Sequence, residues 1–423
     1  MSGGVDSSVA ACLLAEQGYE VVGLFMRVGA TEPRSHEATE GNVQTSKRQN
    51  VKIDGTELSE PGAPATGHLS YIRKGAESSD CRSAIDDCHP EATEPPCVPP
   101  WEGGRRAHQG CCSASDAGDA RFVAGMLGIP FYALNFEKDF ERIIDYFADE
   151  YARGRTPNPC VMCNDRLKFG RLFEYADAVG AKYVATGHYA RIGRRGGESV
   201  LMRGVDRKKD QSYVLFGLRR EALDRVMFPI GELGKEEVRR LAGKYGLPNR
   251  NKPDSVEICF VPDRDYAKVV RQRRPEAFAA GEVVDTMGSV IGRHDGIANF
   301  TIGQRRGLRI AAGRPIYVTQ LDVLNNRVVM GEGDALCAGG LVAERVNLHV
   351  ADLGEEFRAE VKIRYLHQAV PATVRMLDGG RVRVVFDEPQ RAVTPGQAVV
   401  FYDGEIVLGG AWIAENREVR SEK

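Results

Sequence analysis

The sequence has no apolar run long enough to cross a bilayer, and its first residues lack the basic start and apolar stretch of a signal peptide. It also lacks an excess of either charge, because 57 lysines and arginines face 59 acidic residues. That balance excludes a polycation that coats nucleic acid over its whole surface, although it leaves room for a local basic face. These features favour a cytoplasmic protein without a membrane partner. Its 423 residues correspond to roughly two to four domains of ordinary size.

Cysteine is plentiful, with ten residues, but a reducing compartment argues against a disulfide framework. Cys81, Cys88, Cys97 and His89 fall within residues 30–108, a stretch rich in Glu, Ser, Thr, Pro and Gly and poor in large apolar residues. Such a composition cannot supply a core, so we expect a disordered insertion in which these cysteines are incidental. We predict no metal site here or elsewhere in the chain.

Outside that insertion, the first half of the chain alternates between helical and strand patterns. The expected helices are Ala10–Gln17, Ser115–Leu127, Lys138–Arg153 and Arg166–Val179, and the expected strands are Glu20–Met26, Phe131–Phe136 and Lys182–Thr186. This alternation predicts an α/β domain with a parallel sheet and helical crossovers.

The pattern changes after about residue 206. The expected elements are short helices at Arg219–Met227 and Lys235–Tyr245, a strand at Val256–Val261, and later strands at Val382–Phe386, Ala398–Tyr402 and Ile406–Leu408. Asp378-Gly379-Gly380 and Asp403-Gly404 are typical of hairpin turns, and the short strands fit a small β-barrel. We therefore expect an α/β domain over 1–207, interrupted at 30–108, a small central domain over 208–282 and a β-barrel over 283–423.

The segment Ser2–Ser8, with the sequence SGGVDSS, is the sharpest signal in the chain. Its two glycines let backbone amides approach an anion closely, and the helix that follows points its positive end at the ligand. It is not a GxxxxGK[ST] loop, because the lysine is missing. It resembles the PP-loop, SGGxDS, of ATP pyrophosphatases, which cleave ATP between the α and β phosphates. That resemblance implies that Asp6 helps to hold magnesium on the pyrophosphate.

PP-loop proteins enter this loop from a central β-strand, whereas here Met1 directly precedes Ser2. We expect either a misassigned start or a sheet that lacks a central member. In the second case the neighbouring strands would keep unpaired backbone groups, and the domain would be less stable.

A second signal is the proline-braced segment Thr156–Asn164, which carries C-x-x-C and leads into a helix. A cysteine at a helix N-terminus is a better nucleophile, because the thiolate is favoured there. The pair could also be half of a zinc site or a redox pair, although a second C-x-x-C is lacking. Far downstream, Cys259 stands alone in the apolar segment Val256–Val261, where a plain core residue is the simplest interpretation.

Together these segments resemble the bacterial tRNA-specific 2-thiouridylase family of PP-loop ATP pyrophosphatases, over residues 1–29 and 110–423. The motifs that carry the resemblance are Ser2–Ser8, Asn158–Asn164, Ala185–Ala190, Lys209–Tyr213, Ser255–Phe260 and Phe300–Leu308. The resemblance implies a PP-loop domain of the adenine nucleotide alpha hydrolase type, a small central domain, and a C-terminal β-barrel that contacts tRNA.

The resemblance also implies residue roles. Cys163 matches the nucleophile and Cys259 the carrier of a persulfide, and Asp6 completes the catalytic set. The residues that match the ATP site are Ser2, Gly3, Gly4, Val5, Asp6, Ser7, Met26 and Gly187. The residues that match tRNA contacts are Asn158, Pro159, Cys160, His188, Lys209, Asp210, Gln211, Arg364, Tyr365 and Gln397.

Several of these residues also have an ordinary structural interpretation. His188 could be a solvated loop histidine, and Lys209 could belong to a solvated basic turn. Arg364 and Tyr365 could be an exposed pair on a barrel strand, although an aromatic ring beside an arginine suits RNA stacking and phosphate contact.

The implied reaction is 2-thiolation of the wobble uridine of tRNA. ATP, with Mg²⁺, adenylates uracil O2, and a persulfide fed by a cysteine desulfurase, directly or through a relay protein, replaces that oxygen with sulfur. The target base must leave its stack to reach the protein. We expect the basic cluster Arg191, Arg194, Arg195, Arg203, Arg207, Lys208 and Lys209 to supply an RNA-binding face.

Three alternatives stay open at this point. One is a PP-loop enzyme that adenylates a small metabolite, as amidotransferase-type synthetases do. Another is a non-catalytic metal-binding or RNA-binding module. The third is a thiolation enzyme with an iron–sulfur cluster on Cys160, Cys163 and Cys259.

Overall fold

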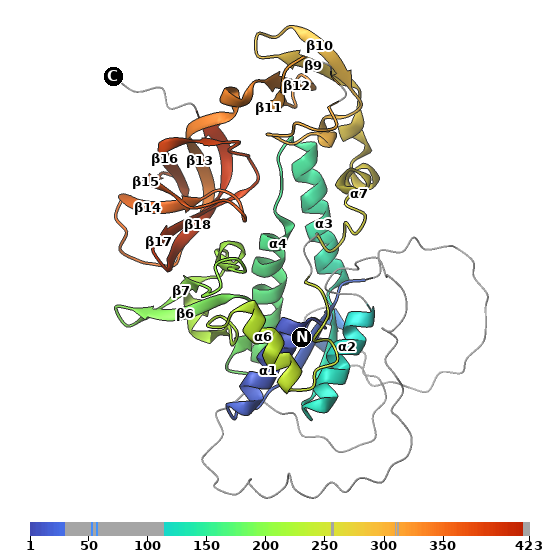
Figure 1. Ribbon diagram of the computed structural model, residues 1–423, viewed down its shortest axis with the longest axis vertical. Coiled ribbons are helices and arrows are strands. Elements are labelled where there is room, and N and C mark those ends of the chain that lie inside the picture. The colour runs from blue at the N-terminus through green and yellow to red at the C-terminus, as the bar shows by residue number, and fades with distance from the viewer. Residues whose placement is uncertain are drawn as a thin grey trace, which may run out of the picture.

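A computed structural model describes residues 1–29, 52–53, 56–57, 114–254, 258–308, 310 and 313–417. Figure 1 shows three bodies along the chain: an α/β body that contains the N-terminus, a small sheet of β9 to β12, and a β-barrel in orange and red. Apart from the short strands β2 (Lys52–Ile53) and β3 (Thr56–Glu57), the expected insertion and its cysteines lie outside the described residues. None of the described helices is long and apolar enough to span a membrane.

The α/β body confirms the predicted alternation. Its first elements are α1 (Val5–Glu16), β1 (Gly23–Arg27), α2 (Ala114–Met126), β4 (Phe131–Asn135) and α3 (Glu137–Ala152). Strands β1 and β4 pair in parallel, with Gly23 opposite Phe131, as a helical crossover requires. A second parallel pair joins β5 (Val184–Ala185) to β8 (Val226–Met227).

The two parallel pairs stay separate, because no strand among the described residues bridges them. The terminal amine of Met1 donates to the carbonyl of Leu24 in β1, so the chain enters the phosphate loop directly beside this strand.

One continuous helical stretch runs through α4 (Pro159–Met162), the π-helix η1 (Cys163–Arg171) and α5 (Leu172–Ala178). It confirms the helix expected at Arg166–Val179 but begins seven residues earlier, since 166 − 159 = 7. The reason is local: the Asn158 side chain accepts a hydrogen bond from the Val161 amide, and Pro159 occupies the first helical position. From Cys163 onward the backbone hydrogen bonds follow the i→i+5 pattern of a π-helix. Such segments are rare and often occur at functional sites.

The C-terminal body is a closed barrel of six strands. In sheet order they are β13 (Cys337–Leu348), β16 (Arg381–Arg391), β15 (Val370–Leu377), β14 (Glu356–Lys362), β17 (Ala398–Asp403) and β18 (Ile406–Arg417). The barrel closes because β13 pairs with both β16 and β18. Both predicted hairpin turns are confirmed, with Gly379, Gly380 and Gly404 at positive φ between paired strands.

In sequence, α7 (Tyr266–Arg273) and the four-stranded sheet come between the α/β body and the barrel. The strands of this sheet are β9 (Gly281–Asp285), β10 (Val290–His294), β11 (Tyr317–Asp322) and β12 (Arg327–Gly331). Their spatial order is β10-β9-β12-β11, with β9 and β12 parallel. Tyr266 stacks on Tyr151 of α3 at a centroid distance of 4.4 Å, which holds this body against the α/β body.

Three predictions of local structure are wrong. The strand expected at Val256–Val261 is replaced, over its described residues, by a turn in which the Val261 amide donates to the Ile258 carbonyl at 2.9 Å. Phe260 buries itself through edge contacts with Phe140 and Phe147 of α3, so its apolar character reflects a packed ring rather than a sheet position.

The helix expected at Arg219–Met227 is a 3₁₀ turn, Arg220–Arg225, that gives way to β8. Val226 adopts an extended conformation because it pairs with Val184. Arg364 and Tyr365, expected on a barrel strand, instead lie in the loop after β14, since the strand ends at Lys362.

Candidate active site

The phosphate loop, Ser2–Ser8, is a compact turn held by its own serines. The Ser2 amide donates to Ser7 Oγ at 3.0 Å, and the Ser7 and Ser8 hydroxyls both donate to the Gly4 carbonyl. Gly4 is the N-cap of α1 and no side chain caps it, so the first-turn amides are available to an anion. This arrangement fits the phosphates of a nucleotide.

Two glycines allow neighbouring segments to approach this loop. Gly3 has φ +68°, and a Cβ there would lie 2.2 Å from the carbonyl oxygen of Asp116. A Cβ on Gly187 would lie 2.6 Å from the Ser7 amide nitrogen. Gly187, predicted at the nucleotide, therefore packs directly on the start of α1.

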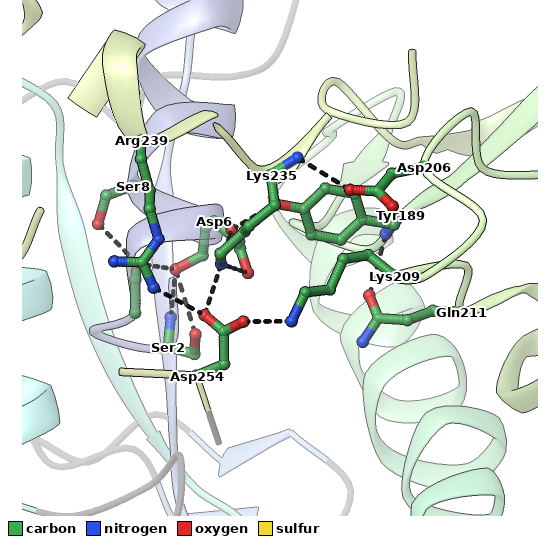
Figure 2. Close-up of polar contacts among 12 residues, drawn as sticks. Ser2, Asp6, Ser8, Tyr189, Asp206, Lys209, Gln211, Lys235, Arg239 and Asp254 are labelled. Carbon is green, nitrogen blue, oxygen red and sulfur yellow. Dashed lines mark hydrogen bonds and ion pairs between the residues drawn. The ribbon is translucent and has the colours of Figure 1, made fainter. Parts of the chain in front are cut away.

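Asp6 is surrounded by donors from distant parts of the chain (Figure 2). Its carboxylate accepts from the Tyr189 hydroxyl at 2.8 Å and from Lys235 Nζ at 2.8 and 3.0 Å. Burial and the Asp6 carboxylate raise the pKa of the Tyr189 phenol, which therefore stays a donor. Lys235 begins helix α6 (Lys235–Lys244), and the Asp206 carboxylate accepts from its backbone amide.

Asp254 forms ion pairs with three basic side chains beside this cluster. Lys235 Nζ lies 2.6 Å and Lys209 Nζ 2.7 Å from its carboxylate, while Arg239 lies 3.6 Å away. Burial alone would raise the pKa of Asp254, but the hydrogen bonds from Lys209 and Lys235 outweigh it and lower that pKa. Asp254 is therefore a carboxylate that orients two lysines near the phosphate loop.

The other side of the loop is held by Asn249 and Lys252. Asn249 Nδ2 donates to the Gly3 carbonyl and to Ser8 Oγ, and Lys252 Nζ donates to the same carbonyl at 3.2 Å. Lys252 also pairs with Asp116 and Asp119 of α2, and these acidic groups raise its pKa although burial opposes the shift. The loop is thus fixed by side chains more than 200 residues away in sequence.

The cysteine loop, Thr156–Cys163, is held by the barrel. The Thr156 amide donates to the Pro395 carbonyl at 2.9 Å, and Gln397 Nε2 donates to the carbonyls of Thr156 and Pro157. Because the helix begins at Pro159, Cys160 lies in its first turn and Cys163 one turn further in. The helix start thus lies nearer to Cys160 than to Cys163, whereas the sequence interpretation assigned its effect to Cys163.

The bridging segment, Lys209–Val214, connects the two loops. Lys209 pairs with Asp254 on the phosphate side. Gln211 accepts from the Tyr189 amide at 2.9 Å, directly behind the phenol that reaches Asp6. Asp210 is buried and accepts from the Ser212 hydroxyl. Further along the segment, the Val214 carbonyl accepts from Nδ2 of Asn164, the residue directly after Cys163, at 3.0 Å, so the segment ends against the cysteine loop.

Cys163 and Cys259 border the same core of buried side chains, centred on α3. Cys259 follows the Asp254 cluster by five residues, and its neighbour Phe260 contacts α3. Cys160 is exposed, whereas Cys163 and Cys259 are partly buried. Among the described side chains, no group of three or more His, Cys, Asp or Glu is arranged to hold a metal ion.

Comparison with known proteins agrees with this division into bodies. The model of the tRNA methyl transferase HUP domain matches residues 1–54 and 101–263, that of the tRNA methyl transferase PRC-barrel domain matches residues 267–332, and that of the aminomethyltransferase beta-barrel domain matches residues 338–413.

Curated relatives match almost the whole chain. A protein of Rhodopirellula baltica is 45% identical over 98% of this chain and 94% of its own length. Proteins of Geobacter metallireducens and Carboxydothermus hydrogenoformans are 44% and 43% identical, each over 98% of this chain and at least 95% of its own length. All three are named tRNA-specific 2-thiouridylase MnmA. The chain belongs to the tRNA-specific 2-thiouridylase family.

Most of the 2-thiouridylase motifs lie at the two loops and the bridging segment described above. Several side chains that match tRNA-contacting positions, however, bond to or pack against other parts of the protein. His188 is buried between Phe169 and Phe228, with Nδ1 2.7 Å from the Thr186 hydroxyl. Arg364 donates to the Arg391 carbonyl, and Tyr365 packs at an angle on Tyr213. Cys160 is exposed beside this loop, and Met26 lies at the carboxyl end of β1.

The basic cluster expected to bind RNA forms ion pairs with carboxylates, and its first members lie on β6 (Ala190–Arg195) and β7 (Glu198–Arg203). The pairs are Arg191–Glu405, Arg194–Asp224, Arg195–Asp403, Arg203–Glu360, Arg207–Glu405 and Lys209–Asp254. Four of these pairs involve residues of the barrel or its turns, namely Glu360, Asp403 and Glu405, which pairs twice. The cluster therefore also joins the barrel to β6, β7 and the segment that follows them.

Sequence reasoning missed the residues that surround the phosphate loop. Lys235, Asn249 and Lys252 belong to none of the motifs that carried the family resemblance. Asp254 directly precedes the Ser255–Phe260 motif, but nothing in the sequence indicated that its partners are lysines from two other segments.

Proposed function

We propose that the chain uses ATP to activate O2 of the wobble uridine in tRNA and replaces that oxygen with sulfur, giving 2-thiouridine, AMP and pyrophosphate. The observation that carries this proposal is the bridging segment. It connects an anion-binding loop to a C-x-x-C loop within one domain, so activation and sulfur transfer can act on the same atom. The names of the relatives support the assignment to tRNA, and we place the reaction in the cytoplasm, where tRNA is available.

In the first half-reaction, O2 attacks the α-phosphorus and the bond to the bridging oxygen of pyrophosphate breaks. The amides and hydroxyls of Ser2–Ser7 bind the phosphates, with Met26 and Gly187 beside the nucleotide. Asp6 is the carboxylate suited to Mg²⁺, which neutralises phosphate charge when bound. Tyr189, held behind Gly187 and bonded to Asp6, fixes the orientation of that carboxylate.

In the second half-reaction, the outer sulfur of a Cys259 persulfide attacks C2, and AMP leaves with the original O2. The Cys163 thiolate then attacks the inner sulfur, which releases 2-thiouridine and leaves a Cys163–Cys259 disulfide. A dithiol reductant restores both thiols, and a persulfide donor fed by cysteine desulfurase recharges Cys259. The shared core that both cysteines border is consistent with such a meeting.

The tRNA reaches the cysteine loop with its target base out of the stack. Asn158, Pro159 and Cys160 line the base, and Lys209, Gln211, Arg364, Tyr365 and Gln397 contact the surrounding RNA. His188 and Asp210 are buried, so we propose that they act indirectly. Through their hydrogen bonds with Thr186 and Ser212 they hold the segments that contact the RNA. Methyl transfer, named in the family description, requires neither a phosphate loop nor a persulfide.

The deciding experiment is incubation with unmodified tRNA, ATP, Mg²⁺ and a persulfide source, followed by mass spectrometry of the nucleosides. 2-Thiouridine formed only when ATP and persulfide are both present supports the proposal. Pyrophosphate release without tRNA, driven by a small metabolite, would favour the synthetase alternative. Iron and labile sulfide in anaerobically purified protein would favour a cluster-dependent thiolation.

A further inference from the structure

The phosphate loop contains no lysine, yet a lysine from elsewhere reaches it. Lys235 Nζ lies 2.8 Å from Asp6 Oδ1, and only 11% of its side chain is exposed. Helix α6 packs against α1, and the two share a buried core that includes Val9 and Val238. The ammonium group is therefore fixed next to the first turn of α1, where phosphate oxygens would bind.

The position of Lys235 is controlled by a second carboxylate. Asp254 lies 2.6 Å from the same ammonium group and also pairs with Lys209, so it orients two cations toward one side of the loop. Figure 2 shows Lys235 between Asp6 and Asp254, with Lys209 on the other side of Asp254. A lysine ammonium has three donors, so Lys235 can keep Asp254 while it exchanges Asp6 for a phosphate oxygen.

We propose that Lys235 is a catalytic phosphate ligand that binds the β and γ phosphates of ATP, and that Asp254 is its positioning residue. This inference rests on the proposed cleavage between the α and β phosphates. When that bond breaks, the bridging oxygen takes the electron pair and the departing pyrophosphate gains negative charge. Lys235 supplies a fixed positive charge at that point, the role for which the GxxxxGK[ST] loop uses its own lysine.

A purely structural role for Lys235 would make a different prediction. If the lysine only neutralises Asp6 and joins α6 to α1, then its removal should lower stability and weaken every ligand of the nucleotide site alike. A phosphate ligand should instead discriminate between ligands: ATP and inorganic pyrophosphate should lose affinity, whereas AMP, which lacks the β and γ phosphates, should not.

The test is calorimetric titration of the full-length Lys235→Ala and Lys235→Arg variants with Mg²⁺–ATP, pyrophosphate and AMP. We expect Lys235→Ala to bind ATP and pyrophosphate about 10- to 100-fold more weakly, the range for a charge-assisted hydrogen bond, with AMP affinity within about twofold. Lys235→Arg should recover part of the loss. Asp254→Asn should give a smaller loss with the same preference for phosphate-rich ligands.

Arg240→Ala is the matched control, because Arg240 lies on the exposed face of α6 and pairs with Glu237 on the same helix. It should leave all three affinities unchanged. Equal losses for ATP and AMP, or no loss for either in the folded Lys235→Ala and Lys235→Arg proteins, would overturn the proposal. These affinities are measured without tRNA, so they still report on Lys235 if thiolation itself is not found.

Discussion

The phosphate loop and the cysteine loop both precede a helix, but different forces hold them. The phosphate loop is surrounded by charged and polar side chains, with Lys235 and the neutral Tyr189 on Asp6 and Lys252 on the Gly3 carbonyl. The cysteine loop is held mainly through its backbone, which bonds to Pro395 and accepts from Gln397 of the barrel. The phosphate loop is therefore suited to bind a charged group, and the cysteine loop to hold a fixed backbone shape. This difference fits the proposed function, in which the first loop binds a triphosphate and the second a base.

This difference implies that the two half-reactions can be separated by mutation. Changes at the phosphate loop should stop activation, and changes at the cysteines should stop sulfur transfer after activation has occurred. The bridging segment is where the two effects should meet, because Lys209 bonds to the phosphate side while the Val214 carbonyl accepts from Asn164, directly after Cys163.

The largest effect is expected at the two cysteines. Cys163→Ser and Cys259→Ser should each reduce 2-thiouridine formation by on the order of 1000-fold or more, as loss of an essential nucleophile does, while pyrophosphate is still released. Cys160→Ser is the matched control and should keep measurable thiolation. Nucleoside mass spectrometry and a pyrophosphate assay on the same reactions provide both readouts.

Peptide mapping after a single turnover without reductant should find Cys163 linked to Cys259. A bridge between Cys160 and Cys163, together with an active Cys259→Ser variant, would show instead that a simple dithiol does the chemistry and that Cys259 carries no sulfur.

The next largest effect is expected at Asp6. Asp6→Ala should reduce pyrophosphate release by about 100-fold or more, because the proposed ligand of Mg²⁺ is lost and Lys235 loses its partner in the cluster. Binding of tRNA, measured by filter retention, should stay within about twofold. Normal AMP production by this variant would contradict the assignment of the phosphate loop.

The sequence was sufficient for the parts of this fold that local chemistry determines. Asn158 and Pro159 form the N-cap and first position of a helix, as the segment leading into a helix indicated, and Gly379 and Gly380 provide the positive φ angles of a hairpin. The residues of the phosphate loop were recognisable for the same reason, because anion binding by backbone amides needs small residues at fixed spacing.

The errors arose where distant contacts decide. Phe260 has the apolar neighbours of a strand residue, but the rings of Phe140 and Phe147 hold it in a turn. The arginines near residue 200 pair with carboxylates such as Asp403 and Glu405 across the barrel contact, and the sequence did not indicate these partners. Charge in a sequence window says nothing about the opposite charge that folding brings beside it.

Lowering the pH should weaken the contact between the barrel and the α/β body. Burial lowers the pKa of His349 to about 4, and its Nε2 donates to the Leu218 carbonyl at 2.8 Å, which joins the barrel to the α/β body. Because the folded pKa lies below the unfolded value, the stabilisation is complete above about pH 6.5 and is lost as pH falls toward 4. The Asp254 carboxylate, whose pKa is lowered by its lysines, should keep its ion pairs over this range.

The expected loss is roughly 3 kcal/mol in the free energy of unfolding between pH 7 and pH 4. Urea titration of the native protein and of His349→Gln at both pH values measures it, and the variant should lose correspondingly less. A native protein and variant with the same pH dependence would show that His349 does not control the contact.

The smallest effect is expected at the point where barrel and cysteine loop touch. Gly396 has φ +90°, and a Cβ there would lie 2.9 Å from the Thr156 carbonyl oxygen. Gly404 provides a matched control, since it also has a positive φ, +56°, but has no atom within 4 Å of such a Cβ. Both alanine variants should lose about 1 kcal/mol of stability from backbone strain, but only Gly396→Ala must also displace the loop that carries Cys160 and Cys163.

We therefore expect Gly396→Ala to thiolate tRNA about 10-fold more slowly than Gly404→Ala, with equal affinity for ATP. A small displacement of the reacting groups lowers the rate, while the phosphate loop is unchanged. Initial rates of thiolation and ATP titrations on the two variants measure this difference. Equal rates would mean that the cysteine loop keeps its shape without the barrel, and the contrast between the two loops would then fail.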